Sequence, residues 1–156
     1  MLRSTQFLAL MTTIALLFGS ASAGARGETE EAESTDLKVV NGWVAMPMWD
    51  GDEPPAYFTI MNQGPARRRI VGASSPHCER MEVRRSALIG ETMASEELDG
   101  FDVPGGGGAV AFVPRGLFLR MISPKPLAEG DPLTIVLEFA NGEKLPFDAI
   151  VKESAR

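Results

Sequence analysis

The sequence predicts an all-β domain, an antiparallel sandwich or barrel of Greek-key type. Apolar residues recur with a period of two, as at residues 56–61 (AYFTIM) and 133–139 (LTIVLEF), which is the spacing of half-buried strands. Short runs of this kind follow one another at intervals of about ten residues and are separated by glycine and proline, as is typical of such folds. No stretch carries a sustained amphipathic helical pattern.

The expected strands are short apolar runs bounded by turn residues. In chain order they cover residues 37–46, 56–61, 68–73, 79–85, 91–95, 109–113, 117–122, 133–139 and 145–151. Asn141 and Gly142 lie between the last two runs, and this pair tolerates the positive φ angles of a type I′ turn. We therefore expect the last two strands to form a hairpin, and the glycine-rich residues 104–108 to form a loop.

The first part of the chain is predicted to lie outside this domain. Arg3 precedes an apolar stretch at residues 7–18, and residues 19–23 (GSASA) offer a signal-peptidase site, so residues 1–23 are interpreted as a secretory signal. No cysteine follows the apolar stretch directly, so lipid anchoring is not indicated. Residues 24–36 are acidic and small and predict a disordered leader, which leaves residues 37–156 as one domain.

Composition excludes several classes of function. The 156 residues include one His and one Cys, too few for a zinc site of four such ligands or for an internal disulfide. The net charge of −6 argues against a nucleic-acid binder, which needs a basic face. His77 has no recognisable nucleophile arrangement around it, and residues 105–108 lack the Lys-Ser/Thr of a phosphate loop, so we predict that the protein is not an enzyme.

Four segments in sequence order carry a resemblance to a known family. They are residues 56–64 (AYFTIMNQG), 70–76 (IVGASSP), 104–106 (PGG) and 126–131 (PLAEGD). In these segments the chain resembles the periplasmic copper chaperones of the PCu(A)C family, over about residues 41–151. The resemblance implies a cupredoxin-like sandwich in an exported, periplasmic protein that carries Cu(I) to partners such as the copper site of cytochrome oxidase.

The family's copper ligands are a His, a Met about eleven positions later, and a downstream His-x-Met pair. Such soft, neutral ligands favour Cu(I). Here the corresponding positions fall on Arg84, Ser95, Phe118 and Arg120. None of the four expected ligands is present. Instead, Arg84 and Arg120 place two guanidinium groups there, and each would repel a cation 4 Å away by about 4 kcal/mol at an effective dielectric constant of about 20. Such a pocket favours an anion or a partner carboxylate, although these arginines also fit an ordinary solvated surface.

Other soft donors offer a remodelled copper site. His77 and Cys78 adjoin the strand that lacks its His, and Met93 lies two residues before Ser95, on the same strand face. Each also has a plain alternative, as an exposed loop His, a buried Cys and a core Met. Met81 and Met121 have the wrong strand parity and are expected in the core, and Met46 and Met48 fit either packing or a partner-contacting edge.

Two hypotheses follow from these observations. The first is an exported copper chaperone whose site is remodelled around His77, Cys78 and Met93, with Cu(I) as its cargo and a periplasmic copper protein as its partner. The second is a copper-free periplasmic interaction or scaffold module that keeps the fold.

Overall fold

The computed structural model describes residues 36–153, and it is built of strands alone. In chain order they are β1 (Leu37–Ala45), β2 (Pro55–Asn62), β3 (Arg68–Ser74), β4 (Cys78–Ile89), β5 (Thr92–Glu97), β6 (Phe101–Val103), β7 (Gly108–Phe112), β8 (Leu117–Pro124), β9 (Pro132–Phe139) and β10 (Lys144–Lys152). The predicted all-β class is confirmed. Within the described range, no helix is long and apolar enough to cross a membrane. The predicted signal at 1–23 and all but the last residue of the predicted leader at 24–36 lie outside this range.

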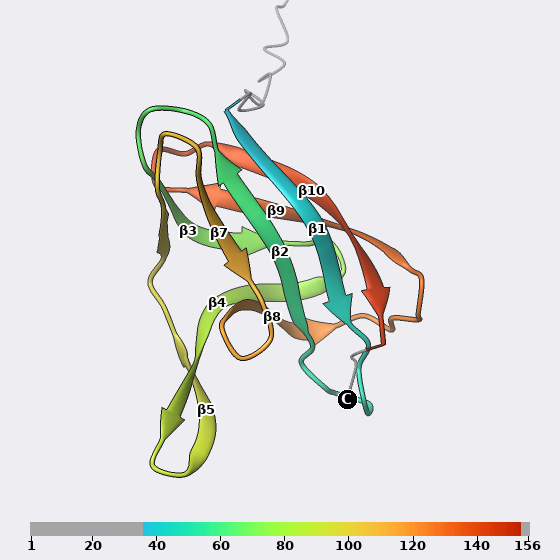
Figure 1. Ribbon diagram of the computed structural model, residues 1–156. Coiled ribbons are helices and arrows are strands. Elements are labelled where there is room, and N and C mark those ends of the chain that lie inside the picture. The colour runs from blue at the N-terminus through green and yellow to red at the C-terminus, as the bar shows by residue number, and fades with distance from the viewer. Residues whose placement is uncertain (1–35, 154–156) are drawn as a thin grey trace, which may run out of the picture.

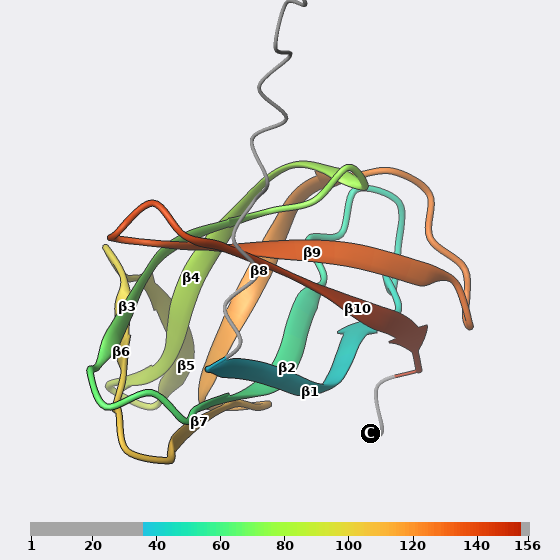
Figure 2. The same cartoon turned by 90° about the horizontal axis from the view of Figure 1, so that it is seen from above.

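The strands form one sheet in the order β5-β4-β8-β7-β2-β1-β10-β9-β3-β6, in which β8 also pairs with β2. The sheet curls on itself, so that β10 faces β2 across the interior (Figures 1 and 2), where the rings of Phe58 and Phe147 lie 4.9 Å apart. Not every pair is antiparallel as predicted, because β1 runs parallel to β10 and β7 meets β8 through one parallel bridge. A parallel first and last strand joins both ends of the domain in the middle of the sheet.

The core lies between the two halves of the curled sheet. On β10 every second residue is buried, and β9 alternates in the same way, as the period of two predicts. Phe58 of β2 stacks on Phe112 of β7 with ring centroids 4.3 Å apart. Met81 and Met121 face each other in the β4–β8 ladder and are both buried, which confirms their expected place in the core.

The predicted hairpin at Asn141 and Gly142 is present, but its turn differs from the predicted type. β9 ends at Phe139 and β10 begins at Lys144, so four residues connect the strands, and among them only Gly142 has a positive φ, of 84°. The Asn141 side chain accepts a hydrogen bond from the Glu143 N–H at 3.1 Å. This local bond holds Asn141 in an Asx turn and replaces the two positive φ angles of a type I′ turn.

Two elements differ more clearly from the predicted strands. β6 was not predicted, because three residues between Gly100 and Pro104 carry no period. β4 runs to Ile89 rather than ending at residue 85, and it turns at Gly90 (φ 64°) directly into β5. The resulting β4–β5 hairpin projects from the body of the domain (Figure 1).

Candidate functional site

The four positions at which the resemblance places copper ligands lie together on β4, β5 and β8. Arg84 of β4 is in register with Phe118 of β8, and its Nε donates a hydrogen bond to Ser95 Oγ of β5 at 3.0 Å. Arg120 Nη2 donates to the same Ser95 oxygen at 3.4 Å, and its Cζ lies 5.9 Å from the centre of the Phe118 ring. The backbone therefore gathers the four positions at one place, but with side chains of different chemistry.

A guanidinium group holds the centre of this cluster. Besides its bond to Ser95 Oγ, Arg84 donates to the Ser95 carbonyl at 2.8 Å and to a Glu82 carboxylate oxygen at 2.8 Å. Glu82 is only 8% exposed, and its other oxygen lies 2.5 Å from Arg80. Two cations thus compensate the buried carboxylate, and Arg84 links β4 to β5 in the way a shared ligand would.

Arg120 is less completely paired than Arg84. Its Nη1 lies 3.7 Å from Glu53, its bond to Ser95 is long, and its Nε is buried without a hydrogen-bond partner among the described residues. A guanidinium carries five donors in a fixed fork, which suits a carboxylate. The cluster can therefore accept an oxygen ligand, whereas a metal cation would meet two guanidinium charges.

The sequence analysis did not identify Glu82 or Glu53 as members of this cluster. Glu82 had a signal, because it lies two residues from both Arg80 and Arg84 and so shares their strand face. Glu53 had none, because it precedes β2 in a loop whose approach to Arg120 depends on the tertiary fold.

His77 and Cys78 lie at the other end of β4. The His77 carbonyl accepts the Lys125 N–H at 2.8 Å, and the His77 N–H donates to Ser75 Oγ at 3.3 Å. Cys78 is half-buried against the core, and this burial raises the pKa of its thiol. A raised pKa makes the thiolate that a metal ligand requires harder to form.

Met93 does not join His77 and Cys78. It pairs with Leu88 of β4, ten positions beyond Cys78, which is about 33 Å along an extended strand. β8 begins opposite Arg85, so Met93 also lies beyond the three-strand cluster, with 55% of its surface exposed. Within residues 36–153, no three His, Cys, Asp or Glu side chains are grouped as a metal site.

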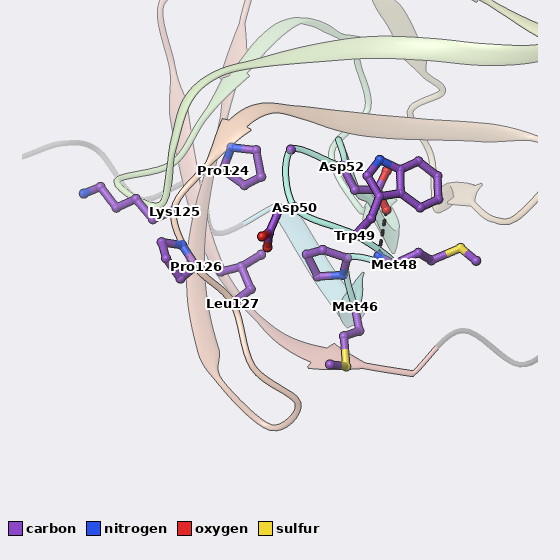
Figure 3. A pocket seen from close by; sticks show the side chains of 11 residues that line it. Met46, Met48, Trp49, Asp50, Asp52, Pro124, Lys125, Pro126 and Leu127 are labelled. Carbon is purple, nitrogen blue, oxygen red and sulfur yellow. Dashed lines mark hydrogen bonds between the residues drawn. The ribbon is translucent and has the colours of Figure 1, made fainter.

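Met46 and Met48 line a separate groove of about 420 Å³, together with Trp49 and the segment from Pro124 to Leu127 (Figure 3). The two methionine side chains extend in different directions, so their sulfur atoms do not meet at one point. Asp52 holds the loop by accepting the Met48 N–H at 2.9 Å. Met46 is 37% exposed and Met48 74% exposed, so of the two alternatives their exposure fits an edge better than packing in the core, and a contact with a partner stays a prediction.

Comparison with known proteins supports the fold that the resemblance implied. The model of the family "LpqE-like: Putative lipoprotein LpqE-like" matches residues 37–151. A "Putative lipoprotein Lxx21020" of Leifsonia xyli subsp. xyli is 24% identical over 160 residues, which cover 98% of this chain and 94% of the relative.

Solved PCuAC domains share the architecture. The copper-bound PCuAC domain from PmoF2 superposes with a TM-score of 0.62 at 16% identity, over 76% of this chain and 94% of that domain. The Cu(I) form of DR1885 from Deinococcus radiodurans gives 0.61 at 22% identity, over 82% and 87%. The all-β fold of this chain is therefore that of the PCuAC domains.

Proposed function

The chain belongs to the LpqE-like family of putative lipoproteins, and on this premise we propose that it is an exported PCuAC-type interaction module that does not carry copper at the family's ligand positions. The module would keep the PCuAC fold and use the β4–β5–β8 surface to bind a carboxylate of a periplasmic partner protein.

One observation carries this proposal, the arrangement of Arg84 among Ser95 and Glu82. Its three hydrogen bonds, between 2.8 and 3.0 Å, place a fixed positive charge among the four positions. That charge disfavours a copper ion there by Coulomb repulsion and favours an anionic group. Arg120 beside it has donors to spare and is one-third exposed, so a partner's carboxylate could displace Glu53 from it.

The alternative is a copper chaperone that binds Cu(I) through His77, Cys78 and Met93 and passes it to a partner such as the cytochrome oxidase copper site. The likeness to copper-bound PCuAC domains favours copper handling. The separation of Met93 from Cys78 means that this site would need either a large movement of the hairpin or a second protein to complete it.

A Cu(I) titration separates the two hypotheses. Residues 24–156 would be titrated against a competing chelator under reducing conditions, beside His77→Ala, Cys78→Ser and Met93→Leu. We expect binding no stronger than that of a generic thiol, and tight one-to-one binding that is lost in these variants would instead establish the remodelled copper site.

A gain-of-function variant supplies the positive control for this titration. Arg84→His, Ser95→Met, Phe118→His and Arg120→Met together restore the ligand types that the resemblance implies, at positions that the fold already gathers. We expect this variant to bind Cu(I) with a clear stoichiometry of one.

A separate pull-down from a periplasmic extract tests the carboxylate interaction. Arg120→Glu should reduce capture of the partner protein, whereas Arg115→Glu should not, since Arg115 lies in the exposed turn before β8. Capture that Arg120→Glu leaves unchanged would refute the interaction.

A further inference from the structure

A second cationic cluster lies at the opposite end of the domain from the β4–β5 hairpin. Arg67, Arg68 and Arg69 are consecutive at the start of β3 and line a hollow of about 240 Å³, together with Asp102, Ala140 and Asn141. None of these residues belongs to the β4–β5–β8 cluster. We call this hollow the triple-arginine patch.

The carboxylates around the patch do not engage its guanidinium groups fully. Arg67 and Arg69 share one carboxylate, that of Asp102, at 3.6 and 3.3 Å. Arg67 is 77% exposed, and Arg68 reaches Glu143 only at 3.9 Å, with its buried Nε making no hydrogen bond within the described part of the chain. Three guanidinium groups facing two carboxylates leave an excess of positive charge and several free donors.

The chain enters the domain beside this patch. The Asp36 carbonyl accepts the Gln63 N–H at 2.7 Å, and Leu37 pairs with Asn62, so the residue before β1 lies against the loop between β2 and β3. Figure 1 shows this loop next to the start of β1. Arg67 lies three positions after Gly64. A Cβ atom added to Gly64 would lie 3.0 Å from the Asp36 carboxylate, so Gly64 and Asp36 are adjacent. Three extended residues span about 10 Å, so the Arg67 backbone lies within about 15 Å of the Asp36 carboxylate.

The segment that precedes Asp36 is complementary in charge to the patch. Glu28, Glu30, Glu31 and Glu33 lie within six residues, and Arg26 is the one basic residue between 24 and 36. Glu33 is three positions before Asp36, so the first of these carboxylates is also within about 10 Å of the entry point, and the others follow along the same tether. A tethered segment meets its site at a high effective concentration, so weak ion pairs suffice.

We propose that the acidic segment at residues 28–33 docks on the triple-arginine patch. Arginine and carboxylate groups pair in a forked geometry, and the Arg67 and Arg69 side chains have donors left for such pairs. This docking does not rest on the proposed function, because it involves neither the β4–β5–β8 cluster nor copper.

The test uses residues 24–156 with Cys78→Ser and a nitroxide label at Thr29→Cys. The backbone amide signals of Arg67, Arg69 and Asn141 should lose intensity through paramagnetic broadening, whereas those of Leu88 and Thr92 at the hairpin tip should not. Raising the salt concentration from 50 mM to 500 mM should restore the lost intensity, because it shortens the screening length from about 14 to about 4 Å.

Two variants make the result decisive. Changing the four glutamates to Gln leaves residues 36–153 untouched and should abolish the selective broadening. Arg67→Gln together with Arg69→Gln should also abolish it. Arg115→Gln is the control and should leave the broadening unchanged. Broadening that survives the glutamate changes would overturn the proposal. So would inorganic phosphate shifting the Arg67 and Arg69 signals equally with and without the four glutamates, since the patch would then be open to external anions.

Discussion

Strands β2, β7 and β10 meet through aromatic rings, whereas β4, β5 and β8 meet at Arg84 through guanidinium, hydroxyl and carboxylate groups. Phe58 lies within 5 Å of the ring centres of both Phe112 and Phe147, and all three rings are buried. Arg84 instead contacts Ser95 and Glu82 through hydrogen bonds. The aromatic region is stabilised by removing apolar surface from water, and the charged region by satisfying buried ionic groups. The difference teaches that the aromatic region depends on buried volume, whereas the contact between β4, β5 and β8 at Arg84 depends on charged and polar groups that a single substitution can weaken.

The largest expected effect tests the aromatic region. Phe58→Ala should lower the free energy of unfolding by about 3–5 kcal/mol, because it removes a buried ring and leaves a cavity between two others. Urea unfolding followed by tryptophan fluorescence measures this loss. Leu88→Ala, at the exposed hairpin tip, is the control and should change stability by less than about 0.5 kcal/mol. Equal losses in the two variants would contradict the assignment of the core.

A smaller effect is expected in the charged region. Glu82→Gln should lower the free energy of unfolding by about 1.5–3 kcal/mol, because the variant weakens charge-assisted hydrogen bonds to Arg84 and Arg80. Glu96→Gln removes the exposed partner of Arg85 and should cost less than about 1 kcal/mol. The two variants remove the same charge but differ in burial and in the number of arginine partners, so similar losses would mean that the buried network does not stabilise the β4–β5–β8 region.

The smallest effect concerns pH and the single tyrosine. Burial raises the pKa of Tyr57 above its ordinary value of about 10, and the ring lies 4.6 Å from that of Trp43. The raised pKa stabilises the fold at pH values below 10, and this contribution is lost as pH rises through the folded-state value. A titration followed by tyrosinate absorbance should give a midpoint above 10, and Tyr57→Phe should lessen the loss of stability at alkaline pH. A midpoint at or below 10 would contradict the burial of Tyr57.

The fold could be predicted from the sequence wherever one face of a strand is buried. β9 and β10 repeat an apolar residue at every second position, and Asn141 and Gly142 mark the connection between them. β6 could not be predicted, because three residues hold too little pattern and its pairing depends on β3.

The candidate site could be predicted in position but only partly in composition. The resemblance predicted that Arg84, Ser95 and Arg120 occupy the family's ligand positions, and the structure brings their side chains together at Ser95. Their correspondence to the family's ligands stays a prediction. Strand parity put Met93 on the same face as Ser95, but a period of two says nothing about where the neighbouring strand ends. β8 begins at Leu117, opposite Arg85, so Met93, which pairs with Leu88, lies beyond the first residue of β8.

The parallel pairing of β1 with β10 also sets an order in time. Trp43 is in register with Ile150, a separation of 107 positions, so this contact is among the last that a growing chain can make. β1 and β2 can pair as soon as both are synthesised, whereas the other side of β1 stays open until the final nine-residue strand is available. The sheet therefore cannot close on this side of β1 until β10 has been made. A chain cut before Lys144 would leave both β1 and β9 with an unpaired edge.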